Sequence, residues 1–211
     1  MIKYQGIKPI VTAALPDKIF LVIPLILFAI LLSHKSLKRT PGYCKGNKLN
    51  TVCMSAVVLI STLVPLLFGS LFQIIKGLLL VVLFTYASVC DYRERKVPDC
   101  VSLMIFLVGL IDVKASDIIF RFAASAAIFG ILFLFACLNK EKFGGADVKF
   151  CSACVFLVGI MNGLSAIIIG LILSVVCTLI RNGIIKSKDK SMPLIPYLSI
   201  GFMTVILIGG F

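Results

Sequence analysis

Charged residues are scarce in this chain of 211 residues: they make up 14% of it, and only nine are acidic. A soluble domain usually has about a quarter charged residues, so the composition excludes an ordinary soluble domain. Hydrophobic residues account for 60% instead, and the mean hydropathy is +1.13. Several apolar stretches reach roughly 18 residues, the length that crosses a bilayer core. The composition therefore predicts an integral membrane protein.

Histidine and tryptophan are also nearly absent, with one histidine and no tryptophan. Any aromatic belt at the membrane surfaces must use the five tyrosines. The single histidine, His34, ends the first apolar run, which is more typical of a span boundary than of a catalyst. This argues against a protease that pairs histidine with serine or with zinc.

The eight cysteines lie mostly in or beside apolar runs, where a free cysteine acts as a small hydrophobic residue. Cys151 and Cys154 form a CxxC pattern, which elsewhere indicates zinc or redox chemistry. Here an apolar run follows it and no second pair is near, so we interpret both as core residues. We expect neither a metal site nor a cofactor.

Hydropathy predicts an all-α fold, a polytopic bundle of about eight transmembrane helices in a single membrane domain covering residues 1–211. The expected spans are residues 17–34, 51–69, 71–90, 99–113, 117–138, 148–161, 163–181 and 194–211.

Basic residues set the expected orientation and give the chain a net charge of +12. Most of the 21 lysines and arginines flank one membrane face, in segments 35–49, 91–98, 139–149 and 181–193. The positive-inside rule places that face in the cytoplasm and both termini outside. We attribute the basic charge to orientation and to contact with anionic membrane lipids, and expect no nucleic acid partner.

Two aspartates differ from the other acidic residues, most of which lie in loops. Asp91 ends one apolar run and Asp147 begins another, with two predicted spans between them. An even number of crossings returns the chain to the same face, so both should lie at one membrane depth. The spans that follow them have only about 15 residues, roughly 22 Å, against a hydrocarbon core of roughly 30 Å.

A pair of carboxylates at that depth favours acid–base chemistry. For either residue alone, a structural role as an interfacial charge or a helix cap is as good an explanation as a catalytic one. Asp147 could cap the start of its own helix. Two close carboxylates share one proton, so one serves as a base that activates water while the other, protonated, polarises a carbonyl. Gly144 and Gly145 suit a backbone that bends sharply or approaches a partner closely.

Three stretches of the sequence resemble the type IV prepilin peptidases, GxGD-type aspartic proteases of the bacterial inner membrane, over roughly residues 70–211. The first is similar to the family's catalytic aspartate, which is followed by a basic loop and an aliphatic residue with proline. The second is similar to its GxGD motif, which is followed by an aliphatic residue and lysine. The third is similar to its proline-rich entry to the last span. In order, the stretches are Asp91-Tyr92-Arg93-Glu94-Arg95-Lys96-Val97-Pro98-Asp99, Gly144-Gly145-Ala146-Asp147-Val148-Lys149 and Met192-Pro193-Leu194-Ile195-Pro196-Tyr197-Leu198-Ser199-Ile200-Gly201.

The resemblance implies a multi-pass enzyme that cuts the basic leader of prepilins or pseudopilins at the cytoplasmic boundary of the inner membrane. Asp91 and Asp147 would be its catalytic pair. The other expected site residues are those of an active-site loop, Gly144, Gly145, Ala146 and Lys149, and those of a possible substrate pocket, Pro98, Pro193 and Pro196. For each proline, helix entry is the alternative explanation.

Two departures from the family pattern matter. The second glycine of GxGD is Ala146 here, and alanine does not readily adopt a positive φ. Segment 35–49 holds one cysteine, Cys44, where bifunctional members carry a large zinc domain linked to N-methylation. No four-ligand zinc site can be built from that segment, so we expect a short form without N-methyltransferase activity.

Other interpretations of the same residues remain open. Lys149 either snorkels to the interface or biases the pKa of a carboxylate, and Lys76 and Arg121 near the outer span ends are typical of snorkelling side chains. A proton- or cation-coupled transporter could also use paired aspartates, and a non-catalytic assembly protein could retain the fold. The sequence identifies neither the particular substrate nor the oligomeric state.

Overall fold

The computed structural model describes residues 70–111, 113–138, 144–185 and 193–209, and five isolated positions before them. Within this part of the chain the fold is all-helical and contains no strand, as the sequence predicts. Its helices are α3 (Leu71–Glu94), α4 (Asp99–Gly109), α5 (Ala115–Leu138), α6 (Gly145–Val158), α7 (Ile160–Ile185) and α8 (Ile195–Gly209).

Three of these helices are long and apolar enough to cross a membrane, namely α3, α5 and α7. The other three are shorter, with 11, 14 and 15 residues in α4, α6 and α8. At about 1.5 Å per residue, α4 covers roughly 16 Å, or about half of the hydrocarbon core. The predicted number of eight transmembrane helices is therefore not confirmed, and the expected spans 17–34 and 51–69 lie almost entirely outside the described residues.

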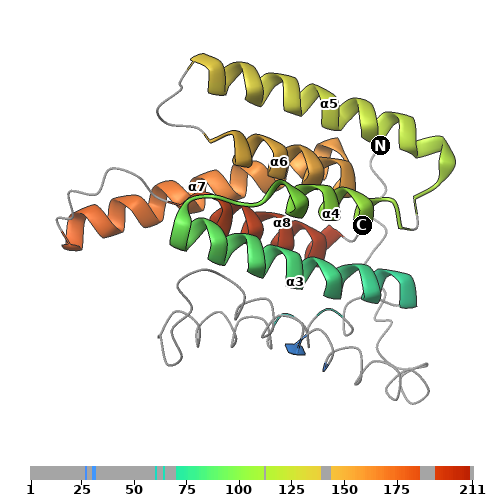
Figure 1. Cartoon of the computed structure of the whole chain (residues 1–211), viewed down its shortest axis with the longest axis horizontal. Coiled ribbons are helices and arrows are strands. Elements are labelled where there is room, and N and C mark those ends of the chain that lie inside the picture. The colour runs from blue at the N-terminus through green and yellow to red at the C-terminus, as the bar shows by residue number, and fades with distance from the viewer. Residues whose placement is uncertain are drawn as a thin grey trace, which may run out of the picture.

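Helix α6 lies at the centre of the described bundle, packed against α4, α5, α7 and α8 (Figure 1). It is buried from its second turn to its end, and Lys149 is exposed near its start. Aromatic rings fix it on two sides, because the ring centroid of Phe150 lies 5.5 Å from that of Phe84 in α3, and that of Phe156 lies 4.1 Å from that of Phe106 in α4. The helix that carries Asp147 is thus held rigidly between its neighbours.

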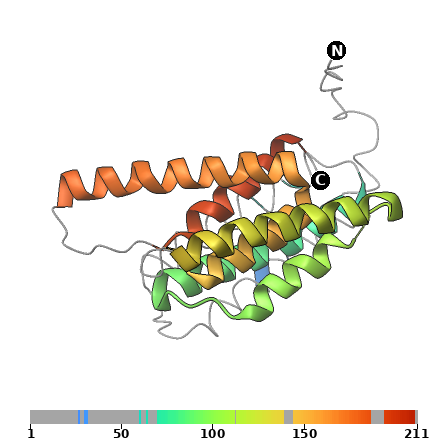
Figure 2. The same ribbon diagram turned by 90° about the horizontal axis from the view of Figure 1, so that it is seen from above.

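The long helices α5 and α7 expose apolar side chains over much of their length. The C-terminal part of α7 also projects beyond the other described helices in both views (Figures 1 and 2). Surfaces of this extent are unfavourable in water and suit contact with lipid. On α5 the exposed large side chains are Ile119, Phe120, Phe122, Phe129, Ile131, Phe133, Leu134, Phe135 and Leu138.

Glycines bring α7 and α8 into close contact. A Cβ atom added at Gly201 would overlap the backbone oxygen of Ala166 and lie 2.8 Å from the amide nitrogen of Gly170. Small residues of this kind allow membrane helices to approach closely. The other end of α7 is joined to α6 by one non-helical residue, Gly159, whose φ of 84° favours glycine. The position of α8 is therefore tied to that of α6.

Two basic side chains bind the C-terminal ends of the short helices, where backbone carbonyls lack helical partners. The Nζ of Lys76 in α3, a residue only 2% exposed, donates to the carbonyl of Ile111 beyond α4 at 3.2 Å. The Nη1 of Arg121 in α5 donates to the carbonyl of Leu157 near the end of α6. Both side chains thus serve the backbone of a neighbouring helix. The burial of Lys76 speaks against snorkelling of that residue, whereas for the partly exposed Arg121 snorkelling stays a prediction.

We expect Gly201→Ala to lower the thermal unfolding temperature of the protein in detergent, because the added methyl group overlaps the backbone of α7. Overpacking of this kind costs about 1–3 kcal/mol. Gly130→Ala in α5 is the matched control, since a Cβ atom there meets nothing within 4 Å. The control should keep or slightly raise the unfolding temperature. An equal loss in both variants would contradict the close α7–α8 contact.

Candidate active site

Four helix ends lie together at one end of the bundle: the C-terminal end of α3 and the N-terminal ends of α4, α6 and α8 (Figure 1). Asp91 lies in the last turn of α3, and Asp147 lies in the first turn of α6. The count of crossings predicted that both aspartates lie at one membrane face. The structure places them at this shared end.

Asp91 lies within α3, whereas the sequence predicted a span ending one residue earlier. The helix continues to Glu94 and ends at Arg95, whose φ of 54° is left-handed. The N–H of Arg95 donates to the backbone oxygen of Asp91 at 2.9 Å. Arg93 adds a positive charge in the last turn, where the helix dipole favours it. Asp91 itself is only 8% exposed, so its carboxylate needs a partner inside the protein.

The N-terminal end of α8 provides that partner. The N–H of Ile195, the first residue of α8, donates to Oδ2 of Asp91 at 3.0 Å. The first N–H groups of a helix have no partner within it and favour an anion. The next residue, Pro196, has no N–H to donate. Deeper in the same two helices, the hydroxyl of Ser88 donates to that of Ser199 at 3.2 Å, so α3 and α8 are joined at two levels.

Asp147 is half-buried and folds back over the start of its own helix. Its Oδ2 accepts a hydrogen bond at 3.3 Å from the N–H of Gly144, the residue before α6. A Cβ atom at Gly144 would lie only 3.2 Å from the same oxygen, so glycine makes room for this arrangement. Asp147 therefore caps α6, which is the structural role that the sequence left open.

The backbone of the expected active-site loop is unstrained. Gly144 has a φ of −80°, and Gly145 and Ala146 are already helical. Among the described residues, positive φ occurs only at Arg95 and Gly159. The departure from GxGD therefore causes no backbone strain, since a helical residue suits alanine well. The expected sharp bend at the glycines is not found, and only Gly144 makes a close approach.

The negative charge of Asp91 acts on the carboxyl group of Asp147, although the two residues come from different helices. Burial, and after it the negative charge of Asp91, raises the pKa of Asp147 from 3.8 to about 6. The N–H of Gly144 opposes this shift by stabilising the ionised form. A carboxyl group with this pKa still holds its proton in mildly acidic solution. The pair can therefore keep one acidic proton beside one carboxylate, as general acid–base chemistry requires.

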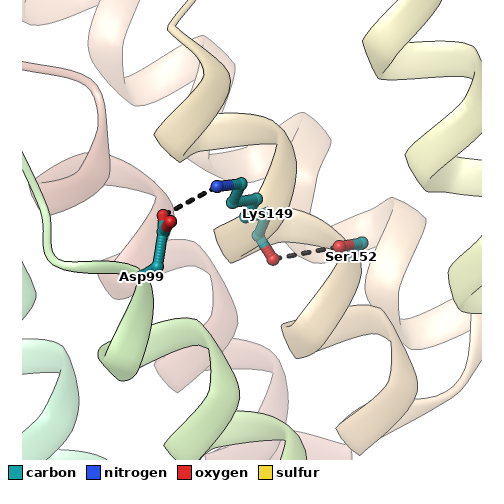
Figure 3. Close-up of polar contacts among 3 residues, drawn as sticks. All are labelled: Asp99, Lys149 and Ser152. Carbon is teal, nitrogen blue, oxygen red and sulfur yellow. Dashed lines mark hydrogen bonds and ion pairs between the residues drawn. The ribbon is translucent and has the colours of Figure 1, made fainter.

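Lys149 points toward the start of α4. Its Nζ lies 2.8 Å from Oδ1 of Asp99, the first residue of that helix (Figure 3). The hydroxyl of Ser152 donates to the backbone oxygen of Lys149 at 3.0 Å, in the same region (Figure 3). The structure thus gives Lys149 a carboxylate partner on another helix, which neither interpretation from the sequence included.

The three prolines of the expected substrate pocket all stand at helix starts. Pro98 is the exposed N-cap residue of α4. Pro193 shortly precedes α8, and Pro196 is the second residue of α8 beside the amide that binds Asp91. Helix entry explains all three positions. Their contact with a substrate stays a prediction.

The CxxC pair belongs to the core, as interpreted from the sequence. Cys151 is 1% exposed and Cys154 is fully buried in α6. No three His, Cys, Asp or Glu side chains gather within the described part of the chain. His34, Cys44 and the segment 35–49 lie outside the described residues. The expected absence of an N-methylation domain therefore stays a prediction.

Two groups that contact the expected site residues were missed by the sequence analysis. Asp99 was noted only as part of a motif, and the amide of Ile195 was not considered. Each contacts a residue far away in the chain, 50 positions from Asp99 to Lys149 and 104 from Asp91 to Ile195. The proline before each helix start was the one available signal, because helix starts offer unpaired N–H groups.

Comparison with known proteins finds a family match for the segment that contains both Asp91 and Asp147. The family model described as the type IV leader peptidase family matches residues 78–180. This match confirms the family resemblance that the motifs indicate. No curated protein and no solved structure matches the chain.

We expect Asp91→Asn to lower the pKa of Asp147 from about 6, because the amide removes a neighbouring negative charge. Burial of Asp147 persists, so its pKa should stay above the ordinary value of 3.8. Infrared titration of the carboxyl band in detergent measures this pKa, and Asp147→Asn assigns the band. A pKa unaffected by Asp91→Asn would mean that the two carboxylates do not interact.

Proposed function

We propose that the chain is a prepilin leader peptidase, because the model of the type IV leader peptidase family, a family of proteases, matches residues 78–180. The reaction would be aspartic endopeptidase cleavage of the basic leader of prepilins or pseudopilins. The observation that carries this proposal is the position of Asp91 and Asp147, two carboxyl groups that α3 and α6 bring to the same end of the bundle.

The surroundings of the two aspartates support different roles for them. The N–H of Ile195 and the dipole of α8 stabilise the ionised form of Asp91. We therefore assign Asp91 the role of the base. The raised pKa of Asp147 favours its protonated form, which makes it the acid. In this scheme Asp91 takes a proton from water as the water oxygen attacks the scissile carbonyl carbon. Asp147 gives its proton to the carbonyl oxygen, which forms a tetrahedral intermediate with two hydroxyl groups. As the C–N bond breaks, Asp91 passes the proton from water to the leaving nitrogen, and Asp147 regains a proton from one of these hydroxyl groups.

The position of the pair suits a substrate that is anchored in a membrane. Both aspartates lie at helix ends, at one end of a bundle whose long helices have the length of a bilayer crossing. A prepilin has a basic leader outside the membrane and an apolar helix within it, and is cut beside a glycine where the two meet. We propose that this end of the bundle faces the cytoplasm of a bacterial cell from the inner membrane. Pro98, Pro193 and Pro196, the residues that we propose to form the substrate pocket, lie at the same end.

The wider architecture in this proposal follows the sequence analysis. It has about eight transmembrane helices in a single domain covering residues 1–211, with a short cytoplasmic segment 35–49 in place of an N-methylation domain. The partners are the prepilin-like substrate and membrane lipids. A proton- or cation-coupled transporter is not favoured, because Asp91 and Asp147 stand at helix ends and both serve as N-terminal caps.

Asp91→Asn and Asp147→Asn should each reduce prepilin cleavage by about a thousandfold or more, because each removes one half of the acid–base pair. Purified variants are incubated with a prepilin, and leader loss is followed on a gel. Asp117→Asn, at an exposed position in the first turn of α5, is the matched control and should cleave normally. Normal cleavage by either site variant, at normal protein yield, would reject the assigned pair.

The rate of cleavage should depend on pH in a way that follows from Asp147. Its proton is lost as pH rises through about 6, so kcat/KM should decline above that pH. At lower pH the second carboxyl group also becomes protonated and no base remains, which gives a bell-shaped profile. The measurement is initial cleavage rate against pH in detergent at constant ionic strength. A rate that keeps rising beyond about pH 8 would contradict the requirement for a protonated Asp147.

A further inference from the structure

The ion pair of Lys149 with Asp99 connects the two segments that carry the aspartates. Lys149 stands two residues after Asp147, and Asp99 stands eight residues after Asp91. Their side chains meet at 2.8 Å near the N-terminal ends of α6 and α4 (Figure 3). The pair therefore bridges the same two parts of the chain whose carboxyl groups interact.

Local structure explains why this end of α4 needs an external contact. The residue before α4 is Pro98, and no side chain at that position caps the helix. Asp99 directs its carboxylate across to Lys149 on α6. On the other side of α6, the hydroxyl of Ser125 in α5 donates to the backbone oxygen of Ser152 at 2.8 Å. The first turns of α6 are thus attached to both α4 and α5.

General stability does not account for the pair. The side chains of Lys149 and Asp99 are 47% and 75% exposed, and ion pairs this accessible contribute little to the stability of a fold. Their effect is instead local, because they join the start of α4 to the start of α6. A small displacement of α6 along α4 changes the separation of the aspartates, and acid–base catalysis is sensitive to shifts of about 1 Å.

We propose that Lys149 and Asp99 are positioning residues that hold the start of α6 against the start of α4, so that Asp147 faces Asp91. Neither residue touches the reacting atoms in this proposal. The catalytic part of the inference rests on the proposed function, whereas the positioning part concerns geometry alone and is testable without a substrate.

The first test measures the pKa of Asp147 by infrared titration in the full-length protein, with the band assigned by Asp147→Asn. Lys149→Gln and Asp99→Asn should both lower this pKa from about 6, because Asp147 moves away from the negative charge of Asp91. A direct charge effect predicts the opposite sign for Lys149→Gln, since losing a cation raises a carboxyl pKa. A raised or unaltered pKa in Lys149→Gln would overturn the proposal.

The second test measures cleavage kinetics. Lys149→Gln and Asp99→Asn should each lower kcat about tenfold while KM stays within about twofold, and the double variant should lose no more than either single variant. Lys149→Arg should retain most activity, and the exchanged pair Lys149→Asp with Asp99→Lys should recover part of it. Lys114→Gln and Asp117→Asn, at exposed positions, are controls for loss of charge.

The two tests separate the possible failures. If the wild-type protein cleaves no prepilin while both variants lower the pKa of Asp147, the proposed function fails and the positioning role stands. The opposite result is that the wild-type protein cleaves prepilin, while the single variants keep a normal kcat or the double variant loses the sum of the two single losses in activity. In that case the positioning role fails and the proposed function stands.

Discussion

The hydrogen bond from the amide of Ile195 to Asp91 is the contact on which the rest of this arrangement depends. It satisfies a buried carboxylate and the start of α8 at once. The position of α8 is set in turn by the glycine contact with α7, and α7 follows α6 after a single residue, Gly159. Asp147 stands at the other end of α6. A continuous path of packed helices therefore connects one carboxyl group to the other, and rigid packing transmits the position of each helix to the next.

Capping and catalysis use the same property of a helix start. Asp147 accepts from the residue before its own helix, and Asp91 accepts from the first residue of a helix 104 positions away. Either contact alone is an ordinary structural cap. The feature that goes beyond capping is the effect of Asp91 on the pKa of Asp147, which requires the two caps to stand close together. The protein thus positions two acidic groups by means that also stabilise its helices.

The sequence predicted the parts of this structure that depend on local patterns. Apolar runs located the described helices to within a few residues, and counting the crossings brought Asp91 and Asp147 to one end. The predicted number of membrane crossings is not confirmed, because two expected spans lie almost entirely outside the described residues and α4 ends at Gly109, too soon to cross a bilayer core. Contacts between distant residues were out of reach, as with Lys149 and Asp99. Such contacts depend on how helices pack, and neither periodicity nor charge at one position determines that.

The cationic side chains at the far ends of α4 and α6 have a consequence for depth in the membrane. Lys76 and Arg121 belong to the long helices and hold carbonyls of the short ones. Long helices adjust to bilayer thickness by tilting or by deforming the lipid around them. Because the short helices are attached to α3 and α5, these two long helices set the distance of Asp91 and Asp147 from the lipid surface. The thickness of the bilayer therefore affects the depth of the carboxyl pair relative to any other helix in the same membrane.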